Sequence, residues 1–284
     1  MVWVEPTYPF RLLVRCSGFM SWRRVLGRVA FVNCDPVFSS LDGRWKILPA
    51  PPAWLTGHLL RRDCLTAPIP TADYALHADV MHLIPDLGIV SKGNVGSVLL
   101  FGNRPIESMR DIALPSDSST SKSLLKWLLE GINLDPKMVE MGPDIETMLS
   151  DCDGALLIGD RALSAASRNP GLVQLDLGAE WTNLTGLPMV FGVFAARRDS
   201  PIELVKEAHD DMVEQYSLFE RDPKVRAAVI GTAAESLGFT RDRMESYFER
   251  EVSNVLDNNS ISGLSHFLRE VCGMEVEPTW FNFY

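Results

Sequence analysis

Six consecutive small polar residues, Ser116-Asp-Ser-Ser-Thr-Ser121, follow a short apolar run at residues 112–114. One Ser, Thr or Asp is enough to cap a helix, so six in a row offer more hydroxyl groups than a cap needs. Free backbone N–H groups at a helix start bind anions, and the positive end of the helix dipole lies behind them. We therefore expect Ser119, Thr120 and Ser121 to hold a carboxylate. The simpler alternative is a helix cap within a solvated loop.

Polar or flexible residues also follow other apolar runs. Asn33 stands in the turn Val32-Asn-Cys-Asp-Pro36, and its amide could both donate and accept hydrogen bonds at a ligand, or cap the next helix. Ser97 follows Gly96 at the start of another run and has a similar status. Gly159 would allow a ligand to approach the backbone, and Asp160 would cap a helix or accept from a substrate hydroxyl. These strand ends together predict a small organic anion held by mainly neutral donors.

The sequence lacks the motifs of several other chemistries. None of the five histidines has the spacing of a metal site, and no glycine-rich nucleotide loop or G-x-S-x-G turn occurs. The five cysteines are scattered without a C-x-x-C pair, which favours free thiols in a reducing compartment. A nucleophilic thiol at Cys34 is the alternative. We expect no metal and no other cofactor.

The net charge of −10 disfavours a nucleic-acid partner, because no basic stripe is present to neutralise phosphates. No apolar run approaches the roughly 20 residues that span a bilayer, so we expect no membrane partner and a cytoplasmic location. Residues 1–24 are expected to be an N-terminal extension, either a disordered tail or, for residues 1–19, outside the translated protein. The oligomeric state is left open.

The order of apolar runs and periodic segments predicts an α/β fold. Strands are expected at residues 25–32, 45–48, 65–69, 87–90, 97–101, 111–114, 138–141, 155–158 and 189–196. Helices are expected at residues 53–61, 121–130, 145–150, 162–167, 202–220, 224–236, 241–256 and 261–271, and a turn or short helix at residues 74–82. The dipeptide Gly93-Asn94 predicts a hairpin between the fourth and fifth strands.

This layout predicts two lobes with a ligand cleft between them. Residues 25–101 and 191–284 would form the first lobe, and residues 102–190 the second. Two crossing strands would act as a hinge. The helical C-terminal region would pack on the first lobe.

Taken in order, several segments resemble the chorismate dehydratase family of menaquinone biosynthesis by the futalosine pathway. The resemblance extends over residues 27–268 and is carried by Gly27-Arg-Val-Ala-Phe-Val-Asn-Cys-Asp-Pro36, Pro85-Asp-Leu-Gly-Ile-Val90, Gly93-Asn-Val-Gly-Ser-Val-Leu-Leu-Phe101, Thr120-Ser121, Ala155-Leu-Leu-Ile-Gly-Asp160, Leu175-Asp-Leu-Gly-Ala-Glu-Trp181 and Thr185-Gly-Leu-Pro188. It implies a fold like the type II periplasmic binding proteins. It also implies conversion of chorismate, a dicarboxylate, to 3-[(1-carboxyvinyl)oxy]benzoate and water, without metal or flavin.

The resemblance also suggests roles for individual residues. It implies that Asn33 contacts the reacting centre, and that Ser97, Thr120 and Ser121 bind the substrate. A carboxylate of the substrate itself would serve as the base, which would explain why no histidine base is apparent. Many relatives carry an arginine within the hydroxyl-rich turn, where this chain has Ser119. Relatives also tend to have a glycine-acidic-x-aspartate run where this chain has Arg62-Asp-Cys-Leu65.

Two other functions remain open at this point. One is a non-catalytic small-anion binding protein of the same fold, although its secreted versions carry a signal peptide that is not evident here. The other is the later dihydroxynaphthoate-forming lyase of the same pathway, whose His-Ser-Pro-Asp-like early turn differs from Val32-Asn-Cys-Asp-Pro36. A scaffold protein has little support, since no repeat or coiled coil is evident.

Overall fold

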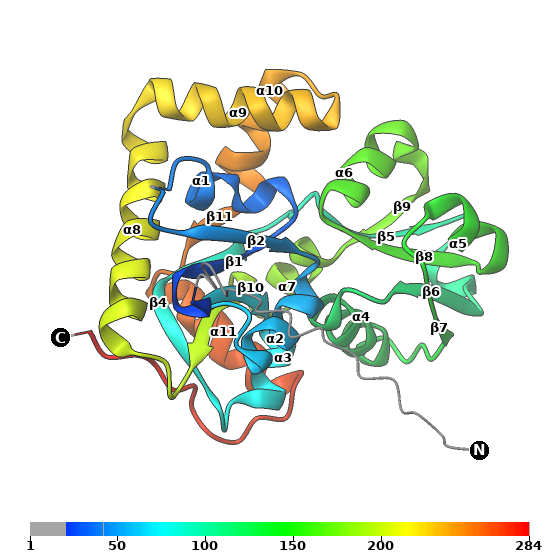
Figure 1. Cartoon of the computed structure of the whole chain (residues 1–284). Coiled ribbons are helices and arrows are strands. Elements are labelled where there is room, and N and C mark those ends of the chain that lie inside the picture. The colour runs from blue at the N-terminus through cyan, green and yellow to red at the C-terminus, as the bar shows by residue number, and fades with distance from the viewer. Residues whose placement is uncertain (1–20, 42, 284) are drawn as a thin grey trace, which may run out of the picture.

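The computed structural model describes residues 21–41 and 43–283. The expected extension therefore lies outside the described residues, apart from residues 21–24, in which Trp22–Arg24 form a short 3-10 helix. The rest of the described chain forms two β-sheets, each flanked by helices, and the sheets belong to two lobes that meet side by side (Figure 1).

The first lobe contains a six-stranded sheet in the order β11-β4-β10-β3-β1-β2. Its strands are β1 (Val25–Val29), β2 (Lys46–Ala50), β3 (Thr66–Pro70), β4 (Met81–Ser91), β10 (Met189–Arg197) and β11 (Ser253–Val255). Strand β10 returns from the second lobe and runs antiparallel between β3 and β4. Residues 189–196 are all buried, as their continuous apolar run predicts for a strand covered on both faces.

The helices of the first lobe come from both ends of the described chain. They are α1 (Asp35–Phe38), α2 (Pro52–Arg61), α3 (Thr71–His77), α8 (Ile202–Arg221), α9 (Pro223–Leu237), α10 (Arg241–Ser246) and α11 (Asn258–Glu270). Helix α8 packs against α1, and α11 packs against β10, so the helical C-terminal region covers the first lobe as predicted (Figure 1).

The second lobe contains a five-stranded sheet in the order β7-β6-β8-β5-β9. Its strands are β5 (Val98–Gly102), β6 (Asp111–Pro115), β7 (Lys137–Met141), β8 (Gly154–Ile158) and β9 (Val173–Asp176). Its helices are α4 (Ser119–Gly131), α5 (Ile145–Asp151), α6 (Gly159–Arg168) and α7 (Leu177–Thr185). One hydrophobic core joins the lobes, since Leu26 and Phe194 belong to the same cluster as Leu100, Leu124 and Trp181.

The predicted hairpin at Gly93-Asn94 is wrong. Strand β4 pairs with β10 and β11, whereas β5 pairs with β8 and β9 in the other sheet. Residues 92–97 are therefore a crossing between the lobes. A turn signal describes only a few residues of backbone, and it does not determine which strands pair.

The same pairing moves the predicted lobe boundaries. Placing residues 25–101 in the first lobe would include most of β5, which belongs to the second sheet. The return crossing lies at residues 186–188, so the whole of β10 is in the first lobe.

The helix expected at residues 241–256 is also wrong in its second half. Helix α10 ends at Ser246, a π-helical turn occupies Tyr247–Glu251, and Ser253–Val255 form β11. Residues Ser253 and Val255 pair with the edge of β4, so a long-range contact overrides the local helical pattern. Strand β9 and helix α7 had no counterpart among the expected elements.

Candidate functional site

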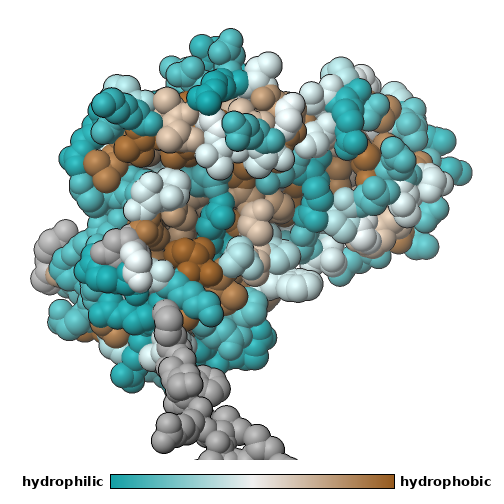
Figure 2. Space-filling model, turned by 45° about the horizontal axis from the view of Figure 1, so that its top comes forward, coloured by the Kyte–Doolittle hydropathy of each residue, from teal (hydrophilic) through white to brown (hydrophobic). Residues whose placement is uncertain are grey.

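A narrow cavity of about 60 Å³ lies between the two lobes. Five residues singled out from the sequence line it: Asn33, Ser97, Thr120, Ser121 and Gly159. Hydrophilic residues dominate the outer surface of the face shown in Figure 2, and apolar residues show through between the lobes. The cavity thus gathers strand ends and helix starts that are far apart in the sequence.

The hydroxyl-rich run forms the start of α4 at the cavity wall. Ser118 is the N-cap residue, but its side chain makes no capping hydrogen bond. Ser118, Thr120 and Ser121 line the cavity, whereas Ser119 does not. The side-chain oxygen of Ser119 is buried without a hydrogen-bond partner among the described residues. The first backbone N–H groups of α4 therefore have no side-chain acceptor, as an anion site requires.

Helix α6 begins at the same cavity, after the buried strand β8. Its N-cap residue, Ile158, has no side chain that could accept a hydrogen bond. The N–H group of Gly159 donates to the carbonyl oxygen of Ser97 at 2.7 Å. This bond joins two cavity-lining segments of the second lobe.

Gly159 is required by its backbone and by its neighbour. Its φ of +59° lies in the left-handed region that favours glycine. A Cβ atom at this position would overlap the ring of Phe31, which reaches across from the first lobe and also lines the cavity. Substitution of Gly159 would therefore disturb both the start of α6 and the position of Phe31.

Asn33 lines the cavity and contains a buried polar atom without a partner in the described protein. It lies in the 3-10 turn Val32–Cys34, and its side chain is 8% exposed. Its amide oxygen has no hydrogen-bond partner in the described protein. Leaving a buried acceptor unpaired costs about 1–3 kcal/mol. A ligand that donates a hydrogen bond here would remove that cost.

Asp160 lies outside the cavity wall. Its carboxylate accepts a hydrogen bond from the N–H group of Val32 at 3.1 Å, and it faces an open groove on the other side of Phe31. Burial raises the pKa of the Asp160 carboxyl to about 6, although the hydrogen bond from Val32 acts in the opposite direction. The expected contact between Asp160 and a substrate hydroxyl is not part of this geometry. Asp160 instead links the two lobes beside Asn33.

The wall of the cavity is neutral. Among the described residues that line it, none carries a charged side chain. The guanidinium group of Arg161 lies 5.4 Å from the centroid of the Phe31 ring, behind the cavity surface, and pairs with Asp117. An anion in the cavity would therefore depend on hydroxyl and N–H donors, with the helix dipoles of α4 and α6 behind them.

A thiol nucleophile at Cys34 finds no support in this geometry. Cys34 is fully buried and does not line the cavity, and burial raises the pKa of its thiol to about 12. Cys34, Cys64, Cys152 and Cys272 are free thiols.

Two kinds of feature are missing from the described part of the chain. Within residues 21–41 and 43–283, no three His, Cys, Asp or Glu side chains are grouped so that they could hold a metal ion. The same residues contain no helix with the length and apolar character needed to cross a membrane.

Ser118 and Phe31 were not singled out from the sequence. Ser118 belongs to the hydroxyl-rich run, so that run was itself the available signal. Phe31 precedes Asn33 by two positions, but no local pattern indicates that its ring would meet Gly159 in the other lobe.

Comparison with known proteins identifies the family. Residues 25–272 match the family model described as menaquinone biosynthesis. A chorismate dehydratase of Thermus thermophilus is 35% identical over 194 residues, which are 62% of this chain and 71% of that protein.

Solved structures confirm the fold. Protein AF1704 from Archaeoglobus fulgidus has a TM-score of 0.70 at 20% identity, covering 88% of this chain and 97% of its own. The alkanesulfonate-binding protein SsuA from Xanthomonas axonopodis pv. citri, bound to MOPS, has a TM-score of 0.62 at 16% identity. The match covers 89% of this chain and 94% of the SsuA chain. The predicted two-lobed, periplasmic-binding-protein-like fold is therefore confirmed. The resemblance read from the sequence is confirmed as well, and the chain belongs to the menaquinone biosynthesis family.

Proposed function

We propose that this protein is a chorismate dehydratase, a hydro-lyase that converts chorismate to 3-[(1-carboxyvinyl)oxy]benzoate and water in menaquinone biosynthesis. The observation that carries the proposal is the neutral cavity in which the hydroxyl-rich start of α4 and the unpaired amide of Asn33 lie together. Membership of the family and the chorismate dehydratase relative support the same reaction.

The reaction suits a site of this kind. Breaking the ring C–O bond to the hydroxyl group and the neighbouring ring C–H bond makes the ring aromatic, so the overall step is strongly downhill. The protein must orient chorismate, assist removal of the ring proton and help the hydroxyl leave as water. The amide of Asn33 is proposed to contact the reacting centre and to donate to the leaving oxygen.

The base is proposed to be a carboxylate of chorismate itself. No His, Asp, Glu or Lys lies among the described residues of the cavity wall. The proton leaves the ring carbon for that carboxylate as the C–O bond breaks, and the departing hydroxide takes this proton from the carboxylate to give water. Asp160, which lies outside the wall, is proposed to hold the Asn33 turn through its bond with Val32.

The carboxylates of chorismate need donors that are not cations. We propose that Thr120, Ser121 and the first N–H groups of α4 hold one carboxylate, with Gly159 allowing close approach to the start of α6. Ser119 is proposed to support this turn from behind, since it does not line the cavity.

Substrate entry requires the lobes to separate. A cavity of about 60 Å³ has room for a few water molecules, since each needs at least about 10–15 Å³ of such space. Among the described residues, the hydrogen bonds that join the lobes include Val32 N–H to Asp160 at 3.1 Å, Ala72 N–H to the Thr120 hydroxyl at 3.1 Å, and Ala53 N–H to the Asp117 carbonyl at 3.3 Å. Opening about the crossings at residues 92–97 and 186–188 would break these bonds and free Thr120 for a ligand.

Incubation of the purified protein with chorismate tests the function. We expect a product lighter than chorismate by one water, with an aromatic spectrum, to appear on chromatography with mass detection. Chorismate that remains unchanged but raises the Tm would favour the non-catalytic binding protein, which the SsuA-like fold also permits. Unchanged chorismate without stabilisation would refute both.

The identity of the base has its own test. Asn at position 160 can still accept from the N–H group of Val32, so Asp160→Asn should retain turnover. Loss of turnover with chorismate binding retained would identify Asp160 as a protein base and overturn the substrate-carboxylate hypothesis.

The setting of the enzyme is part of the proposal. We propose a cytoplasmic enzyme that acts on a small-molecule substrate and has no nucleic-acid partner, in line with its net charge of −10. The later lyase of the pathway is less well supported, because Asn33 occupies the early turn where that family has histidine.

A further inference from the structure

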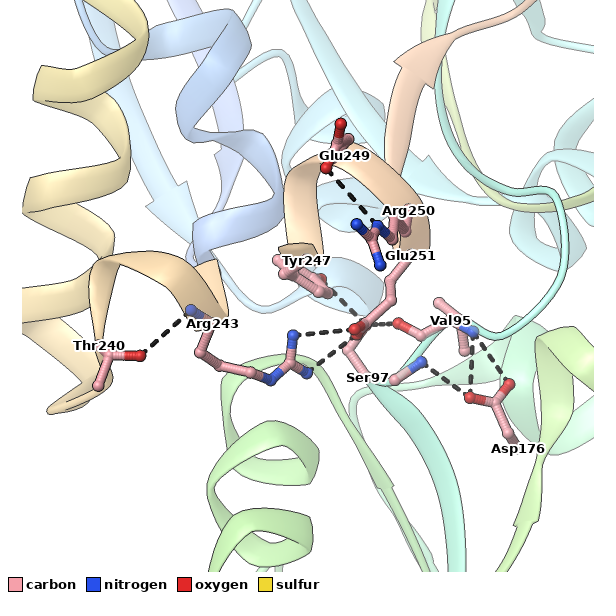
Figure 3. A network of polar contacts seen from close by, with 10 residues as sticks. Val95, Ser97, Asp176, Thr240, Arg243, Tyr247, Glu249, Arg250 and Glu251 are labelled. Atoms are coloured by element: carbon pink, nitrogen blue, oxygen red, sulfur yellow. Dashed lines mark hydrogen bonds and ion pairs between the residues drawn. The ribbon is translucent and has the colours of Figure 1, made fainter. Parts of the chain in front are cut away.

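The crossing segment at residues 95–97 is held from two sides (Figure 3). From the second lobe, the carboxylate of Asp176 accepts hydrogen bonds from the N–H groups of Val95 at 3.0 Å and Gly96 at 2.8 Å. From the first lobe, the π-helical turn Tyr247–Glu251 packs against the same segment. Ser97, at the end of the segment, lines the cavity. Its orientation is therefore set by groups that do not themselves line the cavity.

Tyr247 controls the hydrogen-bonding direction of Ser97. The hydroxyl of Ser97 donates to the carbonyl oxygen of Val95 at 3.2 Å, and the hydroxyl of Tyr247 donates to Ser97 Oγ at 3.0 Å. A carbonyl oxygen can only accept, so the single proton of Ser97 is committed to Val95. Tyr247 is fully buried, and burial raises the pKa of its phenol well above the usual value, so the phenol keeps its proton and stays a donor.

The π-helical turn that carries Tyr247 is itself braced. Arg243 donates two hydrogen bonds to the carboxylate of Glu251, each at 2.9 Å, and its guanidinium group lies 5.8 Å from the centroid of the Tyr247 ring. The carboxylate of Glu251 occupies the space where a Cβ atom on Gly96 would stand, and Gly96 has a φ of +62°. A π-helical turn within a helical region is often found at functional sites. Tyr247 is therefore held in place beside Ser97.

We propose that Tyr247 is a positioning residue that fixes Ser97 as a hydrogen-bond acceptor toward the cavity, so that Ser97 recognises the ring hydroxyl of chorismate and not a carboxylate. A serine hydroxyl has one proton and two lone pairs. The proton of Ser97 is used in the hydrogen bond to the Val95 carbonyl, and one lone pair of Ser97 accepts from Tyr247. Only the second lone pair of Ser97 therefore remains for a ligand. A carboxylate has no proton to offer it, whereas the ring hydroxyl does. This inference rests on the proposed function. It gives Ser97 a different role from the hydroxyl groups of α4, which are proposed to bind a carboxylate.

The test compares two ligands that differ at the ring hydroxyl. Chorismate carries that hydroxyl, and 3-[(1-carboxyvinyl)oxy]benzoate has lost it while keeping both carboxylates. Tyr247→Phe frees Ser97 from its donor, so we expect kcat/KM for chorismate to fall about tenfold, the effect of about one hydrogen bond. The inhibition constant of the product should stay unchanged.

Tyr74→Phe is the matched control. Tyr74 is also fully buried, but its hydroxyl accepts from the N–H group of Thr279 at 2.8 Å in the first lobe and does not reach the cavity. We expect this variant to keep both kinetic constants. Ser97→Ala is a second test should Tyr247→Phe fold poorly. This variant should also lower kcat/KM for chorismate and leave the inhibition constant of the product unchanged. Adding Tyr247→Phe to Ser97→Ala should cause no further loss of kcat/KM.

Each other outcome counts against the proposal. Equal weakening of substrate and product would give Tyr247 a purely structural role, and an unchanged kcat/KM in Tyr247→Phe would overturn the proposal. Failure of the wild-type protein to turn over chorismate would refute the proposed function alone. In that case the dissociation constants of the two compounds, measured by calorimetry on wild type and Tyr247→Phe, decide the role of Ser97, since selective loss of chorismate binding is required.

Discussion

The starts of α4 and α6, at the cavity, differ from the starts of α9 and α11 elsewhere in the molecule. Asp222 caps α9 by accepting from the N–H groups of Lys224 and Val225, and Asp257 caps α11 by accepting from that of Ser260. At the cavity, Ser118 makes no capping bond at the start of α4, and Ile158 has no capping group at the start of α6. Side chains thus satisfy the starts of α9 and α11, while the starts of α4 and α6 keep donors available for a ligand.

Two buried asparagines show the same contrast. The side-chain amide of Asn254 donates to the carbonyl oxygen of Gly88 at 3.1 Å, and the residue is 2% exposed. Asn33 is 8% exposed, and its amide oxygen has no partner. Natural proteins often lose some stability at functional sites. Among the described residues that line the cavity, Asn33 has such an unpaired buried polar atom.

The largest expected difference in activity is between alanine variants of the two asparagines. We expect Asn33→Ala to lower kcat for chorismate by roughly 100- to 1000-fold, as removal of one donor to a developing charge does in other enzymes. Its Tm should change little, because the amide oxygen has no partner to lose. Asn254→Ala should leave kcat unchanged and cost about 1–3 kcal/mol of unfolding free energy, since the Gly88 carbonyl loses its donor. Steady-state kinetics and denaturant titration of both variants measure this. A stability loss in Asn33→Ala equal to that in Asn254→Ala would break the contrast.

A second pair of variants, at two glycines, distinguishes the effect of backbone strain on stability from the effect of cavity shape on activity. Gly159 and Gly238 both have a positive φ, of +59° and +69°, but a Cβ atom at Gly238 would meet open space. We expect each alanine variant to lose about 1 kcal/mol of unfolding free energy from the left-handed conformation. Only Gly159→Ala should displace Phe31 and lower kcat/KM, by about tenfold, because the reacting groups would be misplaced. Equal kcat/KM values in the two variants would show that the Phe31 contact does not shape the site.

The capping contrast itself can be measured with Ser118 and Asp222. We expect Asp222→Ala to reduce the unfolding free energy by about 1 kcal/mol without changing kinetics, the usual effect of losing a cap. Ser118→Ala should leave the Tm unchanged and raise KM by about fivefold, since it removes a cavity hydroxyl worth about 1 kcal/mol. If Ser118→Ala destabilised the protein and left KM unchanged, the hydroxyl would be an ordinary cap.

The smallest effect is a dependence of stability on pH that differs between two aspartates. Burial raises the pKa of Asp160 to about 6, so the folded protein binds its proton more tightly than the unfolded chain. That contribution to stability is complete below about pH 4 and is lost as the pH rises through about 6. The N–H group of Thr147 lowers the pKa of Asp144, the cap of α5, so its contribution has the opposite sign and is lost as the pH falls.

Denaturant titrations of Asp160→Asn and Asp144→Asn between about pH 3 and pH 7 measure both dependences. Relative to wild type, Asp160→Asn should gain stability as the pH rises, and Asp144→Asn should lose it. Parallel curves for wild type and Asp160→Asn would show that burial does not shift this carboxyl.

Local sequence patterns predicted most of the polar residues of the cavity wall, but not its apolar residues. Asn33, Ser97, Thr120, Ser121 and Gly159 all line it, and each stands at a strand end or a helix start that an apolar run makes visible. Such positions are readable because strand ends and helix starts leave backbone groups unpaired. Asp160 shows the limit of this reasoning. It directly follows Gly159, yet its side chain lies outside the wall, since one position along a helix rotates the side chain by about 100°.

Sequence by itself determined the α/β class, most of the strands and helices, the family and the hydroxyl-rich helix start, because these depend on periodicity and residue type over short stretches. Only the tertiary structure decided that Gly93-Asn94 belongs to a crossing, that the ring of Phe31 meets Gly159, and that the hydroxyl of Tyr247 reaches Ser97. Tyr247 and Ser97 are 150 positions apart in the chain. Their contact follows from the packing of two lobes around a shared core, which no local pattern encodes.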